Sequence, residues 1–145
     1  MPASAPQFKV SLASSLSDIQ AAQRLRYDVF VSELGGTGPL VDHKNRLEVD
    51  SYDAQADHLI LRDMGRDAAD QVVGVYRLLS DVGENGFSCG NEYDLAPLLA
   101  SGKSLVELSR SCLHPDYRGG TAMFHLWQAL AAYVADHSVD LLFGV

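Results

Sequence analysis

The chain has 145 residues, and its 11 Lys and Arg against 19 Asp and Glu give a formal net charge of −8 at pH 7. This acidic balance argues against general nucleic-acid binding, which needs a basic surface, and against docking on anionic lipid through bulk charge. The length suits a single domain covering residues 1–145. The two cysteines, Cys89 and Cys112, show no metal-ligand spacing, and no secretory leader is recognisable. We therefore expect a cytoplasmic protein without a bound metal.

Hydrophobic patterns predict a strand and then a helix in the first part of the chain. Residues 8–13 alternate apolar and polar side chains, as a half-buried strand does. Ser17 with Gln20 three residues later forms a capping box, so we expect a helix over 18–34, ended by two glycines. Residues 35–52 have the composition of a long polar loop. Loops of that length inside compact domains are usually functional.

Strand and helix patterns alternate through the rest of the chain. The apolar runs at 58–63 and 71–80 are separated by a turn and predict an antiparallel hairpin. A strand at 104–115, a helix at 119–137 and a buried strand at 139–145 predict a final β-α-β unit. The order indicates a mixed α/β sheet. Because the chain stops on an uncovered apolar strand, we expect a domain truncated at its C-terminus.

Acidic side chains gather in one turn of the long loop. Glu48, Asp50 and Asp53 lie within six residues, together with Tyr52. A solvated loop or an Asx-turn explains such a cluster, and so does a cation site. The calcium alternative is weak, because the turn lacks the glycine and the bidentate glutamate of a calcium loop.

Charged residues also occur inside apolar elements. Arg26 shares a helix face with Phe30, four residues further on. Arg77 lies in the run VVGVYRLL, where an unpaired buried guanidinium costs on the order of several kcal/mol, so it needs a carboxylate or the surface. Glu107 and Arg110 are three apart in one strand. They face opposite sides of the sheet unless a bulge intervenes.

Each of these residues alone is compatible with a solvated surface charge. Together, they predict one buried charge network that holds the long loop over a pocket for a charged, polar substrate. The expected members are Glu48, Asp50, Asp53, Glu107, Arg26, Arg77 and Arg110.

The order of these motifs resembles a known family. R-x-x-x-F, E-x-D-x-x-D, V-V-G-x-x-R-L and E-L-x-R follow one another along the chain, and as a set they resemble the acyl-homoserine-lactone synthases of the GNAT acyltransferase superfamily. The stretches GFSCGNEYDLAPLL and ELSRSCLHPDYRGGTAMFHLWQALAAY are more similar to the ornithine-lipid N-acyltransferases. The sequence ELGG stands where the synthases usually carry a tryptophan, which favours the lipid branch. The resemblance covers the chain from about residue 24 to its end.

The resemblance implies a GNAT-like fold, in which helices flank a mixed central sheet, and direct acyl transfer without a permanently bound cofactor. The donor would be the 3-hydroxyacyl phosphopantetheine of acyl carrier protein. The acceptor would be the α-amine of ornithine, in the biosynthesis of ornithine lipid through lyso-ornithine lipid. Glu48 or Glu107 would be the catalytic base. The substrate-binding residues would be Arg26, Phe30, Asp50, Asp53, Arg77 and Arg110.

The expected donor site lies just before the last predicted helix. In RGGTA, Thr121 stands where the GNAT pattern for pyrophosphate has a glycine. Backbone N–H groups at a helix start still bind phosphate, so we expect Arg118, Gly119 and Gly120 to hold the single phosphate of phosphopantetheine. An acidic enzyme that meets an acidic carrier protein needs a local basic patch, and Arg118 with Lys103 is the candidate.

Several alternatives stay open on the sequence alone. One is an acyl-homoserine-lactone synthase that uses S-adenosylmethionine, and another is a non-catalytic acyl-binding module of the same fold. Cys112 beside His114 is a candidate thioester-forming nucleophile, although a strand cysteine more often belongs to a core. Tyr117 is a candidate acid for the thiolate leaving group. The lipid product also suggests peripheral contact with a membrane.

Overall fold

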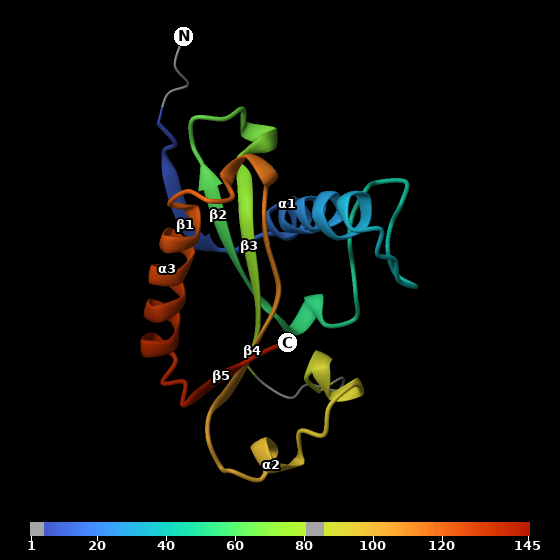
Figure 1. Ribbon diagram of the computed structural model, residues 1–145, viewed down its shortest axis with the longest axis vertical. Helices are drawn as coiled ribbons and strands as arrows, with labels where there is room; N and C mark the ends of the chain where they lie inside the picture. The colour runs from blue at the N-terminus through green and yellow to red at the C-terminus, as the bar shows by residue number, and fades with distance from the viewer. Residues whose placement is uncertain (1–4, 81–85) are drawn as a thin grey trace.

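The computed structural model describes residues 5–80 and 86–145. Its centre is a five-stranded sheet in the order β1-β2-β3-β4-β5 (Figure 1). The strands are β1 (Phe8–Leu12), β2 (Asp57–Asp63), β3 (Val72–Leu79), β4 (Leu105–Leu113) and β5 (Leu141–Phe143). Strands β1 to β4 pair antiparallel, whereas β4 and β5 are parallel. The predicted mixed sheet, the β2–β3 hairpin and the final β-α-β unit are therefore confirmed.

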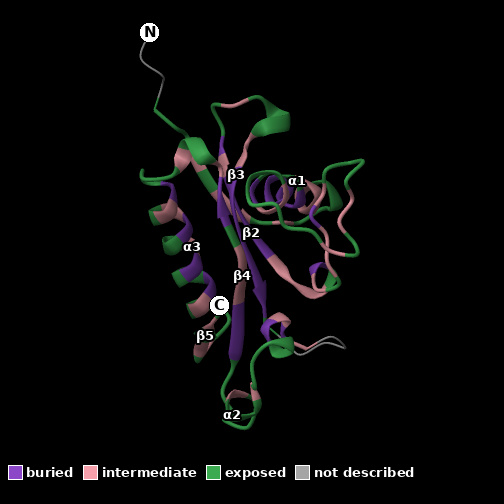
Figure 2. Ribbon diagram, turned by 45° about the vertical axis from the view of Figure 1, so that its right-hand side comes forward, coloured by how far each residue is buried: buried purple, intermediate pink, exposed green. Residues whose placement is uncertain are grey.

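The α-helices lie on both faces of this sheet. The described residues form α1 (Leu16–Arg26), α2 (Ala96–Leu99) and α3 (Ala122–Asp136). Figures 1 and 2 show α1 against one face and α3 against the other, with the buried strands between them. One core cluster, which includes Leu78 and Leu126, joins the sheet to α3, and a second, with Leu25 and Val75, joins it to α1. Within residues 5–80 and 86–145, no helix combines the length and apolarity that a membrane span needs.

The first helix begins earlier than predicted and changes its winding at its C-terminal end. Ser15 is the N-cap, and its hydroxyl accepts a hydrogen bond from the backbone N–H of Asp18 at 3.2 Å. The capping box predicted at Ser17 is therefore wrong. The chain continues from α1 as a π-helix over Tyr27–Glu33, and Gly35 then adopts a φ of 75°. The glycines thus end the helix as expected, and π-helical turns are frequent at functional sites.

A bulge in β4 redirects one charged side chain. The β3–β4 register leaves Tyr76 opposite two residues of β4, Arg110 and Ser111, and Arg110 has a φ of 52°. Before the bulge Leu108 packs on the α3 side, and after it Leu113 takes that side. The extra residue therefore turns Arg110 toward the α1 face. The bulge on which the sequence prediction depended is present.

Candidate active site

The acidic turn is folded against α1 and β3, with Asp53 at its centre. Asp53 Oδ1 accepts hydrogen bonds from Arg26 Nη1 at 2.8 Å and from Arg77 Nη1 at 3.1 Å. Asp53 Oδ2 accepts a further bond from the side-chain amide of Gln23 at 3.0 Å. Both arginines have 0% exposure and Asp53 is 5% exposed. These opposite charges therefore compensate one another away from water.

Glu48, Asp50 and Arg110 extend this arrangement toward solvent. Arg26 Nε and Arg110 Nε both donate to Glu48 Oε1, at 2.8 Å and 3.0 Å. Asp50 accepts from Arg77 Nη1 at 2.6 Å and from Arg110 Nη2 at 3.3 Å. The side chain of Arg110 is 38% exposed and that of Asp50 is 21% exposed, against 7% for Glu48. A substrate can therefore reach the cluster from the side of Arg110.

Burial and ion pairing act in opposite directions on the pKa values of Asp53 and Arg26. We use the name charge cluster for Arg26, Arg77, Arg110, Glu48, Asp50 and Asp53. Burial alone would raise the pKa of Asp53, but Arg26 and Arg77 outweigh it and hold that pKa below its usual value. Burial likewise opposes the charge of Arg26, yet Asp53 and Glu48 raise its pKa. Removing one partner leaves the other charge buried and unpaired, which costs about 3–5 kcal/mol.

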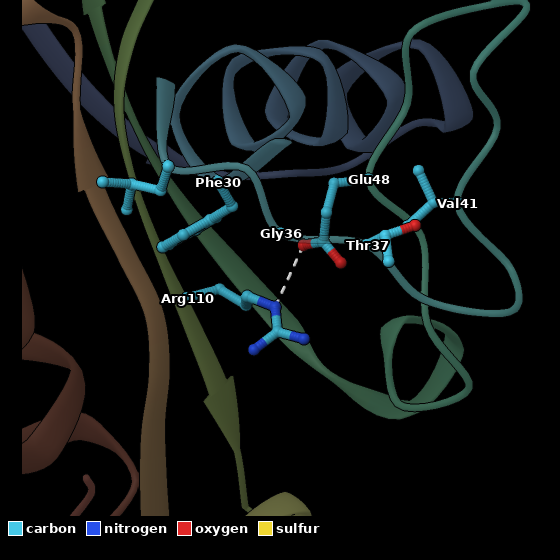
Figure 3. Close-up of a pocket in the computed structure, with 7 residues that line it drawn as sticks. Phe30, Gly36, Thr37, Val41, Glu48 and Arg110 are labelled. Carbon is cyan, nitrogen blue, oxygen red and sulfur yellow. Dashed lines mark hydrogen bonds and ion pairs between the residues drawn. The ribbon is translucent and has the colours of Figure 1, made fainter. Parts of the chain in front are cut away.

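Two cavities open beside the exposed edge of the charge cluster. Their volumes are about 300 and 420 Å³, and both are lined by Thr37, Val41, Glu48 and Arg110. Figure 3 shows the smaller one with Phe30, whose ring centre lies 5.8 Å from the guanidinium carbon of Arg110. In the same view Arg110 binds one oxygen of Glu48, and the other oxygen lies toward Thr37. An apolar hollow with one carboxylate and one guanidinium suits a small zwitterionic ligand.

The predicted convergence of charges is confirmed for every member except Glu107. Its Oε1 accepts from the backbone N–H and the hydroxyl of Ser88 at 2.9 and 2.6 Å, and its Oε2 accepts from the N–H of Cys89 at 2.8 Å. Burial would raise the pKa of Glu107, but the hydrogen bonds from Cys89 and Ser88 lower it. The expectation that Glu107 joins the charge cluster is wrong, because the loop after β3 supplies its partners instead. Its role as a base stays a prediction.

The expected donor residues lie between β4 and α3. Arg118 Nη1 and Nη2 donate to the two carboxylate oxygens of Glu33 at 2.6 and 2.9 Å, and Arg118 Nη2 also donates to the carbonyl of Leu113 at 3.0 Å. Gly119 adopts a φ of 81°, which suits glycine at this turn. Lys103 precedes β4 and Arg118 follows it, and a strand of that length spans roughly 30 Å. The predicted basic patch of Lys103 and Arg118 is therefore wrong.

The other two candidate groups, the Cys112 thiol and the Tyr117 hydroxyl, do not fit the roles predicted for them. Burial raises the pKa of the Cys112 thiol to about 12, which does not favour a thiolate nucleophile. The hydroxyl of Tyr117 donates to Asp63 Oδ2 at 2.5 Å, at the far end of β2. Among the described residues, no group of three or more His, Cys, Asp or Glu side chains is arranged to hold a metal ion.

Sequence reasoning missed the polar contacts that Gln23 and Ser109 make with the charge cluster. Gln23 lies three residues before Arg26, so helical spacing already placed it on the same face. Ser109 accepts a hydrogen bond from Arg77 Nε at 3.0 Å, through the β3–β4 register. No local signal in the sequence reveals that register, because it depends on the bulge.

Comparisons with known proteins show the family of this chain. Residues 25–128 match the acetyltransferase (GNAT) domain family. The L-ornithine N(alpha)-acyltransferase of Rhodobacter capsulatus is 52% identical over 100% of this chain and 58% of its own length. The L-ornithine N(alpha)-acyltransferase of Rhizobium meliloti is 41% identical over 92% of this chain and 47% of its own length. The chain thus spans about half the length of the curated relatives it matches.

Two solved structures have a similar arrangement of elements. The AHL synthase LasI superimposes with a TM-score of 0.68 at 21% identity, over 97% of this chain and 72% of that one. FeeM, an N-acyl amino acid synthase from uncultured soil microbes, superimposes with a TM-score of 0.70 at 15% identity, over 95% of this chain and 70% of that one. At such identities the likeness shows the fold alone.

Proposed function

This chain belongs to the acetyltransferase (GNAT) domain family, and from that premise we propose that it is an N-acyltransferase that acylates the α-amine of ornithine. The relatives named L-ornithine N(alpha)-acyltransferase support this choice of acceptor. The observation that carries the proposal is the pairing of Glu48 with Arg110 at the wall of a pocket. An amino acid offers the complementary pair, an ammonium and a carboxylate on one carbon.

The exposed members of the charge cluster have complementary tasks in this proposal. The guanidinium of Arg110 binds the carboxylate of ornithine, because it is the arginine whose side chain is partly exposed to the cavities. Glu48 receives the α-ammonium. Asp50, with a side chain 21% exposed, takes the second ammonium at the end of the ornithine side chain. The buried Arg26, Arg77 and Asp53 hold these groups in place.

The chemistry requires one base near the amine. The α-ammonium loses a proton to the carboxylate of Glu48, and the free amine attacks the thioester carbon, so a C–N bond forms and the C–S bond breaks. In this proposal, backbone N–H groups at the β4 bulge, where the regular β3–β4 pairing is interrupted, receive the oxyanion. As the thiolate leaves, the nitrogen gives its second proton to the thiolate, and the proton held by Glu48 passes to water, which returns the carboxylate to its starting state. Glu48 is preferred over Glu107 because Glu48 lines both cavities.

The donor in this proposal is a 3-hydroxyacyl group on the phosphopantetheine of acyl carrier protein. Gly119 and Gly120, at the start of α3, offer backbone N–H groups to its phosphate. Glu33 fixes the guanidinium of Arg118 next to these glycines. In this proposal Arg118 attracts the same phosphate. The cytoplasmic location, and a peripheral contact with the membrane through the lipid product, stay predictions.

An acylation assay with the full-length protein tests this function. The protein is incubated with 3-hydroxyacyl carrier protein and either ornithine or S-adenosylmethionine, and the products are identified by mass spectrometry. We expect N-acylornithine and the release of free carrier protein. Acylhomoserine lactone instead would support the synthase alternative. Acyl binding without transfer to either amine would identify a non-catalytic module.

A further inference from the structure

The segment Ser88–Asn91 is held by Glu107 from inside the protein. Glu107 is 1% exposed, and both of its oxygens are occupied by donors from Ser88 and Cys89, at 2.6 to 2.9 Å. Ser88 and Cys89 begin the short 3₁₀-helix Ser88–Asn91. A carboxylate that accepts several N–H and O–H bonds fixes the backbone that donates them. Glu107 is not among the residues that line the two cavities of the site.

The other end of this 3₁₀-helix contacts the pocket. Asn91 Nδ2 donates to the hydroxyl of Tyr52 at 3.1 Å, and both residues line the larger cavity. A second contact between the same two segments joins the amide of Gln55 to the carbonyl of Gly86 at 3.4 Å. Asn91 therefore lies in the wall of the cavity that the acidic turn also lines.

Tyr52 links this wall to the charge cluster. The guanidinium carbon of Arg77 lies 5.6 Å from the centre of the Tyr52 ring, within the range of a cation–π contact. The backbone N–H of Tyr52 donates to Asp50 Oδ1 at 2.9 Å. Tyr52 therefore contacts both Asn91, through its hydroxyl, and the carboxylate of Asp50, through its backbone N–H.

We propose that Glu107 is a positioning residue, whose carboxylate fixes Ser88–Asn91 so that Asn91 and Tyr52 close the acceptor pocket. A base needs a lone pair directed at the amine, whereas three donors from Ser88 and Cys89 hold the carboxylate of Glu107, and Glu107 lines neither cavity of the site. The positioning role of Glu107 rests on the proposed function in one respect, namely that this pocket binds the acceptor amine. It replaces the catalytic role that the sequence suggested for Glu107.

Steady-state kinetics of the full-length protein test the assignment. In Glu107→Gln an amide NH2 group replaces one acceptor oxygen and faces the donors of Ser88 and Cys89, so at least one of their hydrogen bonds is lost. Ser88–Asn91 then becomes less firmly held. We expect the KM for ornithine to rise by about tenfold, the loss of one charged hydrogen bond, with little change in kcat or in the KM for the acyl donor. Asn91→Ala should reproduce the KM effect without touching the buried carboxylate. Glu92→Gln removes a neighbouring exposed charge and serves as the matched control.

Amide hydrogen exchange provides a readout that needs no turnover. The N–H groups of Ser88 and Cys89 are hydrogen-bonded to Glu107, so Glu107→Gln should speed their exchange by about tenfold or more, whereas Glu92→Gln should not. Unchanged exchange in Glu107→Gln would overturn the proposal. So would a loss of kcat at saturating ornithine with the pH dependence of a missing base. If the wild-type protein acylates no ornithine, faster exchange still supports the positioning role while the proposed function fails.

Discussion

Glu48 and Glu107 are both buried carboxylates, yet their surroundings differ in kind. Glu48 is bound by the side chains of Arg26 and Arg110 and lines two cavities. Glu107 is bound by one hydroxyl and two backbone N–H groups and supports a loop. The partly exposed side chain of Arg110 can exchange the carboxylate of Glu48 for that of a ligand, whereas the donors from Ser88 and Cys89 hold Glu107 away from both cavities. The hydrogen-bond donors around a buried carboxylate, more than the extent of its burial, therefore indicate its role.

The largest expected effect comes from breaking the charge cluster around Glu48. Arg26→Met leaves Glu48 and Asp53 without their central cation, so the free energy of unfolding should fall by about 3–5 kcal/mol. Urea denaturation measures the change. Arg46→Met is the matched control, because the Arg46–Asp28 pair is exposed, with side-chain exposures of 58% and 53%, and should contribute little. Equal losses in both variants would contradict the buried network.

The second-largest expected effect is on kcat, and it tests whether Glu48 is the catalytic base or only lines the pocket. Glu48→Gln keeps the size of the side chain and removes the proposed base, so kcat for N-acylation should drop by about 10²–10⁴-fold. The acylation assay at saturating ornithine and donor measures it. Circular dichroism checks that the variant is folded, and Glu92→Gln is again the control. A Glu48→Gln enzyme with wild-type kcat would exclude Glu48 as the base.

Acid should weaken both regions. The pKa values of Asp53 and Glu107 are held below their usual values in the folded state. Their stabilising contribution is therefore present above the unfolded-state values, 3.8 and 4.5, and is lost as the pH falls through the lower folded values. Urea midpoints measured between neutral pH and pH 3 should fall toward acid. Asp53→Asn and Glu107→Gln should each make that dependence shallower, and an unchanged slope would contradict the lowered pKa values.

The smallest effect concerns the donor side of the site. Arg118→Glu should raise the KM for acyl carrier protein about threefold, because a surface charge mainly affects encounter with a charged partner. Lys103→Glu makes the same change in charge at the opposite end of β4, and should leave that KM unchanged. Steady-state kinetics with varied donor measure both. A larger effect of Lys103→Glu would place the carrier protein at the other end of the strand.

The regular elements and most of the charge cluster were predictable from the sequence. Apolar runs separated by a turn located β2 and β3, and the two glycines located the end of the first helix. The mutual need of buried Arg77 and the acids of the turn for partners predicted their contact, because an unpaired buried charge is too costly. Local patterning and charge neutrality thus determine these features.

The failures share a physical cause. Ser15 and Ser17 are equally good N-caps by residue type, and the packing of the helix decides between them. For Glu107, Ser88 and Cys89 supply backbone donors that draw the carboxylate away from the charge cluster. Backbone N–H groups belong to every residue type, so the sequence gives no sign of which ones will meet a carboxylate.

The most direct test compares Glu48→Gln and Glu107→Gln in one N-acylation assay at saturating ornithine and donor. The account predicts that Glu48→Gln loses most of its kcat, while Glu107→Gln keeps a kcat near that of the wild-type protein. The reverse order, with Glu107→Gln inactive and Glu48→Gln active, would contradict the assignment of the proton-accepting carboxylate.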